Sequence, residues 1–415
     1  MEQYLLYSAV LLTIVLGSFA TAQTCYVWLY ARASRSEDSS EPMPSSSPRT
    51  AVIVCLRGHD PSLEECLRSL AAQRFSNLEI HIALDSEQDT AVNPAKEFVA
   101  NCNRPVQLHF LPAQAGTCGL KCDLQSYVIE SLGPDVEIVV FMDADGIARP
   151  DWLERLVAPL SRPNVGAVSG NRWFESAPGW GSQIRRYWNA AAIVQMYLYR
   201  IPWGGALAMR KETIQNADLL TIWRTTLCED TVVKQSLQPL GLDVVYLPRL
   251  VLSSRETTSV SSAANWISRQ LLTAKLYHPS WPLVAMHSLS VGASVVVSSL
   301  FVAIALIAGA WTAALLVFAA FMLYQACNLT IWSWIETSTF EPGTAENHGL
   351  TEPGLLQKAV LITATQLIHS WAAIRAATMR DITWRGIRYR VVGRKIEMLE
   401  YHPYQHSSDS DQSIS

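Results

Sequence analysis

The sequence predicts an α/β protein with a Rossmann-like, mostly parallel sheet and with transmembrane helices before and after it. Three observations support this fold class. Residues 50–280 alternate apolar, β-rich runs with stretches of helical periodicity, as in a parallel sheet covered by helices on both faces. Residues 4–30 contain no charged side chain and are long enough to cross a hydrocarbon core. A second apolar block, residues 281–334, is long enough for two such crossings.

Composition agrees with a chain that is partly embedded in a membrane. Hydrophobic residues make up 49% of the 415 residues and charged residues only 16%. The formal net charge of −4 argues against a nucleic-acid partner. The eight cysteines include no Cys-x-x-Cys pair, so we expect reduced thiols rather than a zinc or redox motif.

The N-terminal apolar run has two interpretations. Ala-Thr-Ala at residues 20–22 resembles a signal-peptidase site, but the first residues lack a basic region and the apolar run continues beyond the alanines. We therefore expect an uncleaved transmembrane anchor at residues 1–31. Arg32 and Arg35 follow it and place that end in the cytoplasm. The Ser/Pro-rich residues 32–49 are expected to form a linker.

The C-terminal part is predicted to return to the membrane. Residues 281–335 suit two transmembrane helices hinged near Gly309, followed by a loop at residues 336–354. Residues 355–378 form a weaker third membrane segment, and residues 379–415 a basic and then disordered tail. Four full crossings from an outside N-terminus would put this basic tail outside, against the positive-inside rule. Either residues 355–378 do not fully cross or the tail breaks the rule.

The predicted strands and helices of residues 50–280 follow one another in a regular order. "TAVIVCLRG", "LEIHIALD", "VQLHFLPA", "VEIVVFMDAD", "VGAVSG" and "LDVVYLP" are strand-like. "SLEECLRSLAAQ" has helical spacing, and Ser62 with Glu65 predicts a capping box at its start.

Two carboxylates follow the most apolar of these strands. Alternate strand side chains point the same way, so Asp143 and Asp145 are expected to converge at the edge where α/β sheets bind ligands. They repel unless a positive group lies between them, and a divalent cation shared with a diphosphate suits that place. The alternative is an acidic turn with a helix cap. Asp85 ends a second apolar strand, and two strands delivering carboxylates to one edge favour the ligand site.

A third acidic feature is Glu229-Asp230, which we expect to open a helix in "TLCEDTVVKQSL". Interaction with the helix dipole explains one of the two carboxylates. Our hypothesis for Asp230 is a general base that takes the proton of an acceptor hydroxyl.

Taken together in their order, these motifs resemble membrane-bound family-2 glycosyltransferases, in particular the ceramide glucosyltransferase-like branch. The matching motifs are "CLRGHDPSLEECLRSL", "ALDSEQD", "GLKCDLQ", "FMDADG", "WGGALAMRKE", "CEDTVVKQSL" and "WRGIRYRV". The resemblance covers nearly the whole chain. It implies that residues 50–280 form a GT-A catalytic domain that faces the cytosol and uses a nucleotide-sugar with Mn²⁺ or Mg²⁺.

The resemblance also implies roles for single residues. Asp85 would bind the uracil or ribose of the donor, and Lys121 would lie near the diphosphate unless it is an ordinary surface lysine. Asp143 and Asp145 would hold the metal ion and the diphosphate, and Asp230 would be the base of an inverting attack. The glycines of "WGGALAMRKE", Gly204 and Gly205, complete the expected donor site.

One motif departs from the family. A Gln-x-x-Arg-Trp motif is usual before the C-terminal spans, whereas this chain has "WISRQ" at residues 266–270. Arg269 keeps the arginine position, and its guanidinium is suited to the charge of a leaving diphosphate. The missing tryptophan puts the usual acceptor platform in doubt, and the small number of spans argues against a processive polymer synthase.

These observations predict an enzyme that transfers a hexose, from UDP-glucose or a related UDP-hexose, to a membrane lipid. The expected acceptor is a hydroxyl of ceramide, a hopanoid or diacylglycerol, which residues 182–203 would help to bind if they form an interfacial rather than an ordinary buried helix. One alternative is transfer to a polyprenyl phosphate, which needs no base. The other is a membrane scaffold with a dead transferase domain. The expected location is a multi-pass membrane protein with its catalytic domain in the cytoplasm.

Overall fold

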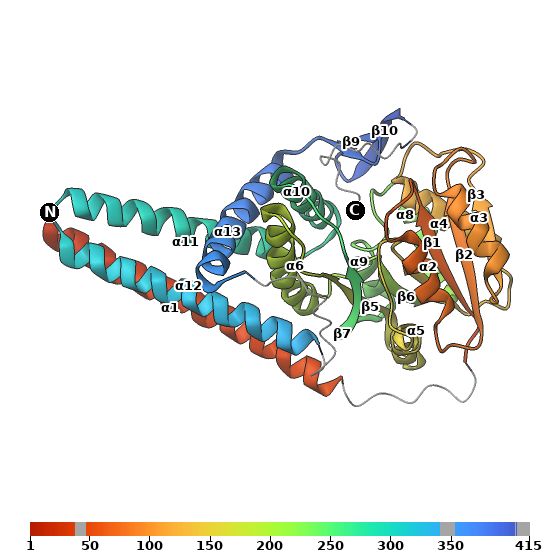
Figure 1. The fold of residues 1–415 in the computed structure, drawn as a ribbon, viewed down its shortest axis with the longest axis horizontal. Coiled ribbons are helices and arrows are strands. Elements are labelled where there is room, and N and C mark those ends of the chain that lie inside the picture. Colours follow the sequence, from red (N-terminus) through yellow and green to blue (C-terminus); the bar gives the residue numbers. More distant parts are fainter. Residues whose placement is uncertain (38–46, 341–352, 403, 405–415) are drawn as a thin grey trace.

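The computed structural model describes residues 1–37, 47–340, 353–402 and 404. A seven-stranded sheet in the order β3-β2-β1-β4-β6-β5-β7 forms the centre of the globular part (Figure 1). Its strands are β1 Thr50–Leu56, β2 Leu78–Leu84, β3 Val106–Phe110, β4 Ile138–Met142, β5 Val165–Phe174, β6 Ala206–Arg210 and β7 Asp243–Ser254. Strands β3, β2, β1 and β4 are parallel, β5 is parallel to β7, and β6 runs antiparallel between β4 and β5. The predicted mostly parallel α/β sheet is confirmed.

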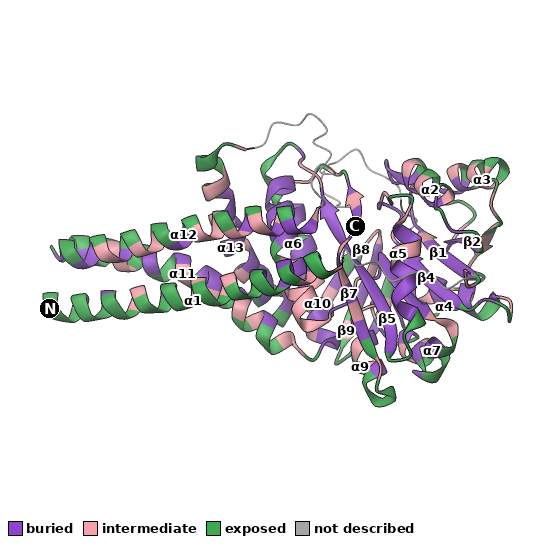
Figure 2. Ribbon diagram, turned by 90° about the horizontal axis from the view of Figure 1, so that it is seen from below, coloured by how far each residue is buried: buried purple, intermediate pink, exposed green. Residues whose placement is uncertain are grey.

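Helices cover both faces of this sheet because each central strand is apolar on both sides. In β1, Ala51 and Ile53 belong to one core, and Val52 and Val54 belong to the other. The first core includes α4 Leu120–Ser131, α6 Trp180–Tyr199, α7 Lys211–Asn216, α8 Leu219–Trp223, α9 Val233–Leu237 and α10 Val260–Tyr277. The second includes α2 Leu63–Ala71, α3 Val92–Asn101 and α5 Trp152–Val157. Figure 2 shows the strands as the most continuously buried part of the molecule.

The expected capping box at the start of α2 is not formed. Ser62 is the N-cap residue, but its side chain makes no cap hydrogen bond. Its hydroxyl instead donates to Asp60 Oδ1 at 2.7 Å. Ser and Asp side chains in turns bond readily to near neighbours, and here that local bond replaces the cap.

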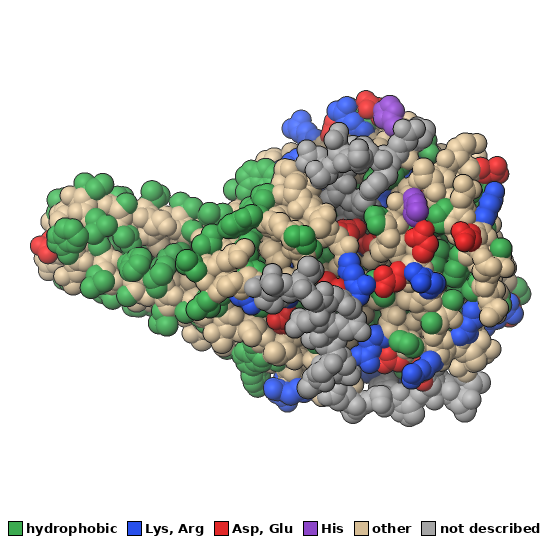
Figure 3. All heavy atoms as spheres, in the orientation of Figure 1, with side chains coloured by type: hydrophobic (Ala, Val, Ile, Leu, Met, Phe, Trp, Pro, Cys, Tyr) green, Lys and Arg blue, Asp and Glu red, His purple; other side chains and the backbone are tan. Residues whose placement is uncertain are grey.

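Three described helices are long and apolar enough to cross a membrane: α1 Glu2–Ser36, α11 Trp281–Ile307 and α12 Trp311–Thr339. They form an arm that projects from the globular part, with α1 packed along α12 (Figure 1). The surface of this arm in Figure 3 is apolar, with almost no charge, as suits contact with lipid. Between α11 and α12, Gly309 adopts a φ of +73°, which glycine tolerates without strain. Helix α1 continues to Ser36, into the stretch expected to be linker.

Helix α13, Leu355–Thr378, is not among those three helices. It packs against α10, α11 and α6, between the arm and the sheet (Figure 1). Helix α6 is buried along most of its length, which favours the buried alternative for this segment over a helix lying on the membrane surface. Most of the expected linker and loop, residues 38–46 and 341–352, lies outside the described residues, as does the expected disordered end at residues 405–415.

The basic segment near the C-terminus is folded. Strands β8 Asp381–Trp384, β9 Ile387–Val392 and β10 Lys395–Tyr401 form an antiparallel sheet in the order β10-β9-β8. Its inner side chains Ile387, Tyr389 and Ile396 are at most 1% exposed and join the larger core. The sequence alone indicated only a basic tail here, because three short strands give a weak periodic signal.

Candidate active site

The two carboxylates of the Asp-Ala-Asp motif converge as expected, and an arginine lies between them. Arg172, in the buried strand β5, approaches Asp143 Oδ2 at 2.6 Å with Nη2 and Asp145 Oδ2 at 3.2 Å with Nη1. Burial opposes ionisation of Asp143, but Lys121 and Arg172 outweigh it and lower the pKa of Asp143 to about 2. Burial raises the pKa of Asp145 to about 7, because Arg172 offsets only part of it. The two carboxyl groups at this edge therefore differ strongly in pKa, and Asp143 gives up its proton far more readily than Asp145.

Lys121 joins this pair to the second acidic motif. It lies in the first turn of α4, and its Nζ is 2.6 Å from Asp143 Oδ1 and 2.8 Å from Glu229 Oε1. It also donates to the Gly204 carbonyl at 3.3 Å. Burial disfavours the charged amine, but the two carboxylates outweigh burial and raise the pKa of Lys121 well above its usual value. Lys121 is thus a cation in the site, not a solvated surface lysine.

The prediction that Glu229 and Asp230 open a helix is wrong. Helix α9 begins at Val233, and the two acidic residues lie in the turn that precedes it. Glu229 faces Lys121 instead of a helix terminus, and its side chain is 2% exposed. Glu229 therefore forms a buried ion pair with Lys121, which is distant in the sequence, instead of interacting with the dipole of the helix that follows it.

Asp230 is held by backbone amides. Its Oδ2 accepts from Gly204 N at 2.9 Å and its Oδ1 accepts from Thr231 N at 2.6 Å. Burial, and next the charge of Glu229, raise the pKa of Asp230 to about 6. A carboxylate with this pKa is ionised near neutral pH and is still basic enough to take a proton.

Gly204 and Gly205 are required because a side chain at either position would overlap neighbouring groups, not because their backbone angles need glycine. A Cβ on Gly204 would overlap Glu229 Oε1, and a Cβ on Gly205 would overlap the Trp203 ring and lie 2.6 Å from Asp143 Oδ2. The Gly205 carbonyl also accepts from Asp143 N at 3.3 Å. These glycines therefore allow the loop before β6 to pass directly over the acidic groups.

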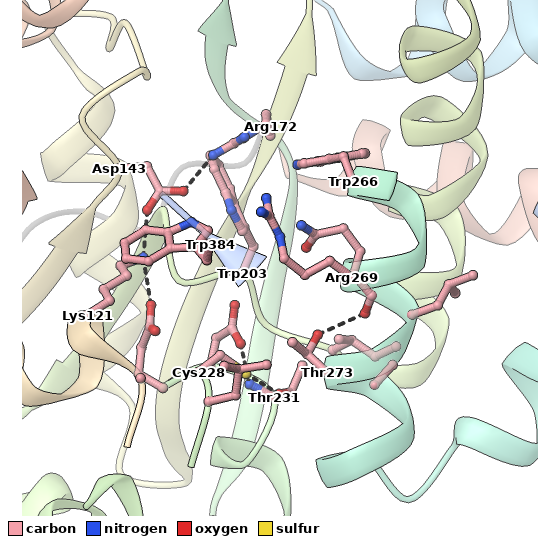
Figure 4. Close-up of a pocket in the computed structure, with 18 of the residues that line it drawn as sticks. Lys121, Asp143, Arg172, Trp203, Cys228, Thr231, Trp266, Arg269, Thr273 and Trp384 are labelled. Carbon is pink, nitrogen blue, oxygen red and sulfur yellow. Dashed lines mark hydrogen bonds and ion pairs between the residues drawn. The ribbon is translucent and has the colours of Figure 1, made fainter. Parts of the chain in front are cut away.

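Arg269 projects from α10 into the same cavity (Figure 4). Its side chain forms no hydrogen bond or ion pair with any residue that the structure describes. Burial, then the charges of Arg385 and Arg172, lower the pKa of Arg269 to about 10. It stays protonated near pH 7 and is available to an anion. Trp266, one turn earlier, packs edge-on against Phe174 and Trp188 at 5.4 and 5.3 Å.

Asp85 does not line this cavity. Its Oδ2 pairs with Arg57 and accepts from Tyr401 Oη at 2.9 Å. Arg57 does line the cavity, so Asp85 stands directly behind it. Five of the site residues expected from the sequence line the cavity: Lys121, Asp143, Asp145, Asp230 and Arg269. Arg172, Trp203 and Glu229 line it with them, whereas Gly204 and Gly205 do not belong to its lining.

Several cavity residues were not singled out from the sequence. Arg172 is a charged residue within a strand that is otherwise uncharged, and that is the one signal that identifies it. Trp203 precedes the glycines, and Trp384 and Arg385 come from the turn between β8 and β9. The Arg172 guanidinium lies over the Trp203 ring, 4.9 Å from its centroid, and Figure 4 shows both residues with Trp384 and Arg269.

The cavity, about 280 Å³, changes character along its length. The charged groups described above form one end. The remaining lining includes polar residues such as Gln195 and Thr273, but much of it is apolar and comes from α6, α10 and α11: Ala192, Ile193, Met196, Leu271, Ala274 and Val284. Both a charged ligand group and an aliphatic chain fit such a lining.

The acidic edge fits a divalent cation that arrives with a phosphate ligand. Among the described residues, no cluster of three or more Asp, Glu, His or Cys side chains forms a complete metal site. Asp145 Oδ2 is buried and accepts no hydrogen bond, although it faces Arg172. Mg²⁺ is commonly held by one or two carboxylates together with substrate phosphates. Asp143 and Asp145 are the carboxylates that the protein would provide as ligands.

Comparison with known proteins assigns the chain to a family. A family model described as glycosyl transferase family 21 matches residues 9–396. An uncharacterized glycosyltransferase of Haemophilus influenzae is 26% identical over 120 residues, 28% of this chain and 33% of that protein. Glycosyltransferase AglE of Haloferax volcanii is 25% identical over 147 residues, 35% of this chain and 46% of that protein. The chain thus matches a third to about half the length of these curated relatives.

Two solved structures are also similar in fold. Mannosyltransferase PcManGT from Pyrobaculum calidifontis, in complex with GDP-Man and Mn²⁺, has a TM-score of 0.48 and 16% identity, over 88% of this chain and 99% of that one. Glucosyl-3-phosphoglycerate synthase from Mycobacterium tuberculosis, in complex with Mn²⁺, UDP-glucose and glycerol 3-phosphate, has a TM-score of 0.34 and 15% identity, over 51% of this chain and 73% of that one. The family match is what decides the identity. Its span of nearly the whole sequence, around a GT-A type sheet with apolar helices at both ends, confirms the expected resemblance at the family level, and the chain belongs to glycosyl transferase family 21.

Proposed function

We propose that this glycosyltransferase moves a hexose from a UDP-sugar, UDP-glucose or a related UDP-hexose, to a hydroxyl of a membrane lipid. The observation that carries the proposal is the two-ended cavity. Its charged end suits a sugar diphosphate, and its apolar end is lined by α6, α10 and α11. Because α11 is apolar enough to lie in a membrane, a lipid can enter from the bilayer with its chains along that lining. Ceramide, a hopanoid and diacylglycerol all have the required hydroxyl.

At the donor end, Asp143 and Asp145 hold the cation, which neutralises diphosphate charge when bound. Lys121 and Arg269 pair with phosphate oxygens, and Arg269 is free to do so because no described residue engages it. Gly204 and Gly205 let the loop before β6 lie directly against Asp143 and Glu229, which helps to hold this end of the site in place. Asp85 acts through Arg57, which it pairs with from behind and which lines the cavity, to orient the nucleoside end.

At the acceptor end, Asp230 takes the proton of the lipid hydroxyl. The hydroxyl oxygen forms a bond to the anomeric carbon as the bond to the diphosphate breaks, and attack from the opposite face inverts the configuration. The backbone donors Gly204 N and Thr231 N fix the Asp230 carboxylate. Its raised pKa favours this hydroxyl acceptor over a polyprenyl phosphate, whose nucleophile is already ionised.

The fold also favours one membrane arrangement. Arg57, at the end of β1, donates to the carbonyls of Arg385 and His402 at 2.7 and 2.6 Å, so the C-terminal sheet lies on the same side as the catalytic domain. An even number of crossings must then follow residue 280. Helices α11 and α12 supply two, and α13 remains on the catalytic side. With Arg32 and Arg35 next to α1, we place that side in the cytoplasm.

The test is a transfer assay with the purified full-length chain in lipid nanodiscs. The protein is incubated with UDP-glucose, with Mn²⁺ or Mg²⁺, and with one short-chain acceptor at a time. The acceptors are ceramide, diacylglycerol and a hopanoid alcohol, and the products are identified by mass spectrometry. We expect a β-linked glycolipid with at least one acceptor and none with chelator present. Transfer to polyprenyl phosphate alone would contradict the proposal, and binding of UDP-sugar without any transfer would support the dead-scaffold alternative.

A further inference from the structure

The turn between β8 and β9 holds an arginine in an unfavourable backbone conformation. Trp384 pairs with Ile387, so Arg385 and Gly386 alone form the turn, and their φ angles are +40° and +77°. Two successive positive φ angles are those of a type I′ turn, for which Asn-Gly and Gly-Gly are preferred. Positive φ at a long side chain such as arginine costs stability. Strain at such a position directs attention to what its side chain does.

Two arginines lock this turn onto the end of β1. Arg57 Nε donates to the Arg385 carbonyl at 2.7 Å, and Arg385 Nη1 donates to the Arg57 carbonyl at 2.6 Å. A further ion pair joins Arg385 to Asp60 Oδ2 at 3.6 Å. The Arg385 side chain is 9% exposed. Its guanidinium is therefore fixed before any ligand binds, which lowers the entropy cost of ligand binding.

The fixed guanidinium belongs to the cavity that contains the acidic edge. Trp384 and Arg385 line it together with Asp143, Arg172 and Arg269. The charge of Arg385 acts on Arg269 strongly enough to be, after burial, the main cause of its lowered pKa. Three arginines from β5, α10 and the C-terminal turn thus face one space. Like charges brought together in this way are stabilised by a multiply charged anion.

We propose that Arg385 binds the diphosphate of the donor, with Trp384 as the aromatic wall beside it, so that the C-terminal sheet completes the donor site. This inference rests on the proposed function, because it assumes a nucleoside diphosphate donor.

The turn offers a substitution that separates binding from folding. Arg385→Asn creates the Asn-Gly sequence that a type I′ turn prefers, and it removes the guanidinium. Arg388→Asn is the matched control, since Arg388 lies on the adjacent strand and pairs at the surface with Asp381 at 2.8 Å. Calorimetry with the full-length proteins in detergent and Mn²⁺ measures the affinities for UDP, GDP and uridine.

We expect Arg385→Asn to weaken UDP binding by about tenfold to a hundredfold, as for loss of a charge-assisted pair. Uridine, which lacks phosphate, should bind both variants and the wild type alike, and Arg388→Asn should leave UDP binding unchanged. UDP affinity of Arg385→Asn within about twofold of wild type would overturn the proposal. So would an equal loss for uridine and UDP, which would assign the turn to the nucleoside end.

If Arg385→Asn does not fold, Arg385→Lys is subjected to the same comparison. A larger loss for UDP than for uridine supports the diphosphate contact, because a point charge cannot replace a guanidinium fork; equal affinities or equal losses refute it. The transfer assay remains independent of these measurements. If the wild-type protein binds UDP but glycosylates no lipid, the proposed lipid acceptor is refuted and the role of Arg385 in diphosphate binding is not affected. If it binds neither UDP nor GDP, both proposals are refuted.

Discussion

Asp230→Asn is the most informative single substitution, because the amide keeps the shape of the side chain and loses its basicity. The carboxylate is held by Gly204 N and Thr231 N, and an amide oxygen can accept one of these bonds. UDP-sugar binding should therefore persist. Turnover should fall by roughly 10²- to 10⁴-fold, the usual contribution of a general base.

The pH dependence of the wild type follows from the same residue. The pKa of Asp230 is raised from 3.8 to about 6 by burial and then by Glu229. Only the deprotonated base is active, so log kcat should rise with pH up to about 6 and then level off. Glu229→Gln removes the neighbouring negative charge, so it should move this rise to lower pH.

The raised pKa also predicts an effect on stability. The ionised form is disfavoured in the fold by at most about 3 kcal/mol, taking about 1.4 kcal/mol per pH unit. This cost is fully present above pH 6 and disappears as the pH falls toward 4, the unfolded pKa. Asp230→Asn should therefore melt at or above the wild-type temperature at pH 8, and the difference should shrink at pH 4.5.

The assay measures initial rates of glycolipid formation from pH 5 to 9, with donor affinity measured separately by calorimetry. Asp243→Asn, at the exposed start of β7, is the control and should behave as wild type. A turnover of Asp230→Asn within about tenfold of wild type, or a wild-type profile without a rise near pH 6, would refute the assignment of Asp230 as the base.

Four further substitutions test the rest of the site. Asp145→Ala should abolish the increase of UDP affinity on adding Mn²⁺ while circular dichroism stays native; a persisting metal effect would show that Asp145 is no ligand. Arg269→Lys should lose most transfer to a short-chain lipid, because one ammonium cannot form the two parallel bonds of a guanidinium, whereas Trp266→Ala should be milder; near-normal turnover of Arg269→Lys would remove it from the active site. Gly204→Ala should impair transfer and lower the melting temperature, since its Cβ would overlap Glu229 Oε1, and wild-type values for both would mean that the loop adjusts freely.

The sequence by itself determined the features that depend only on residues close together in the chain. The apolar runs before Asp85 and Asp143 predicted parallel strands ending at one edge, and the uncharged stretches predicted helices suited to a membrane. These inferences succeed because side-chain alternation and segment length are local properties. Asp143 and Asp145 converge in the turn that directly follows β4, so the sequence predicted their meeting although the strand itself ends at Met142.

Only the tertiary structure decided which charges meet. Arg172 stands between the two aspartates, Lys121 takes Glu229 as a partner, and Arg385 reaches β1 from 328 residues away. No local pattern encodes such pairs, because they form when separate elements pack and a buried charge must find a partner. For the same reason, composition predicted only a basic tail at the C-terminus. The structure shows that this segment forms a sheet whose residues line one side of the cavity.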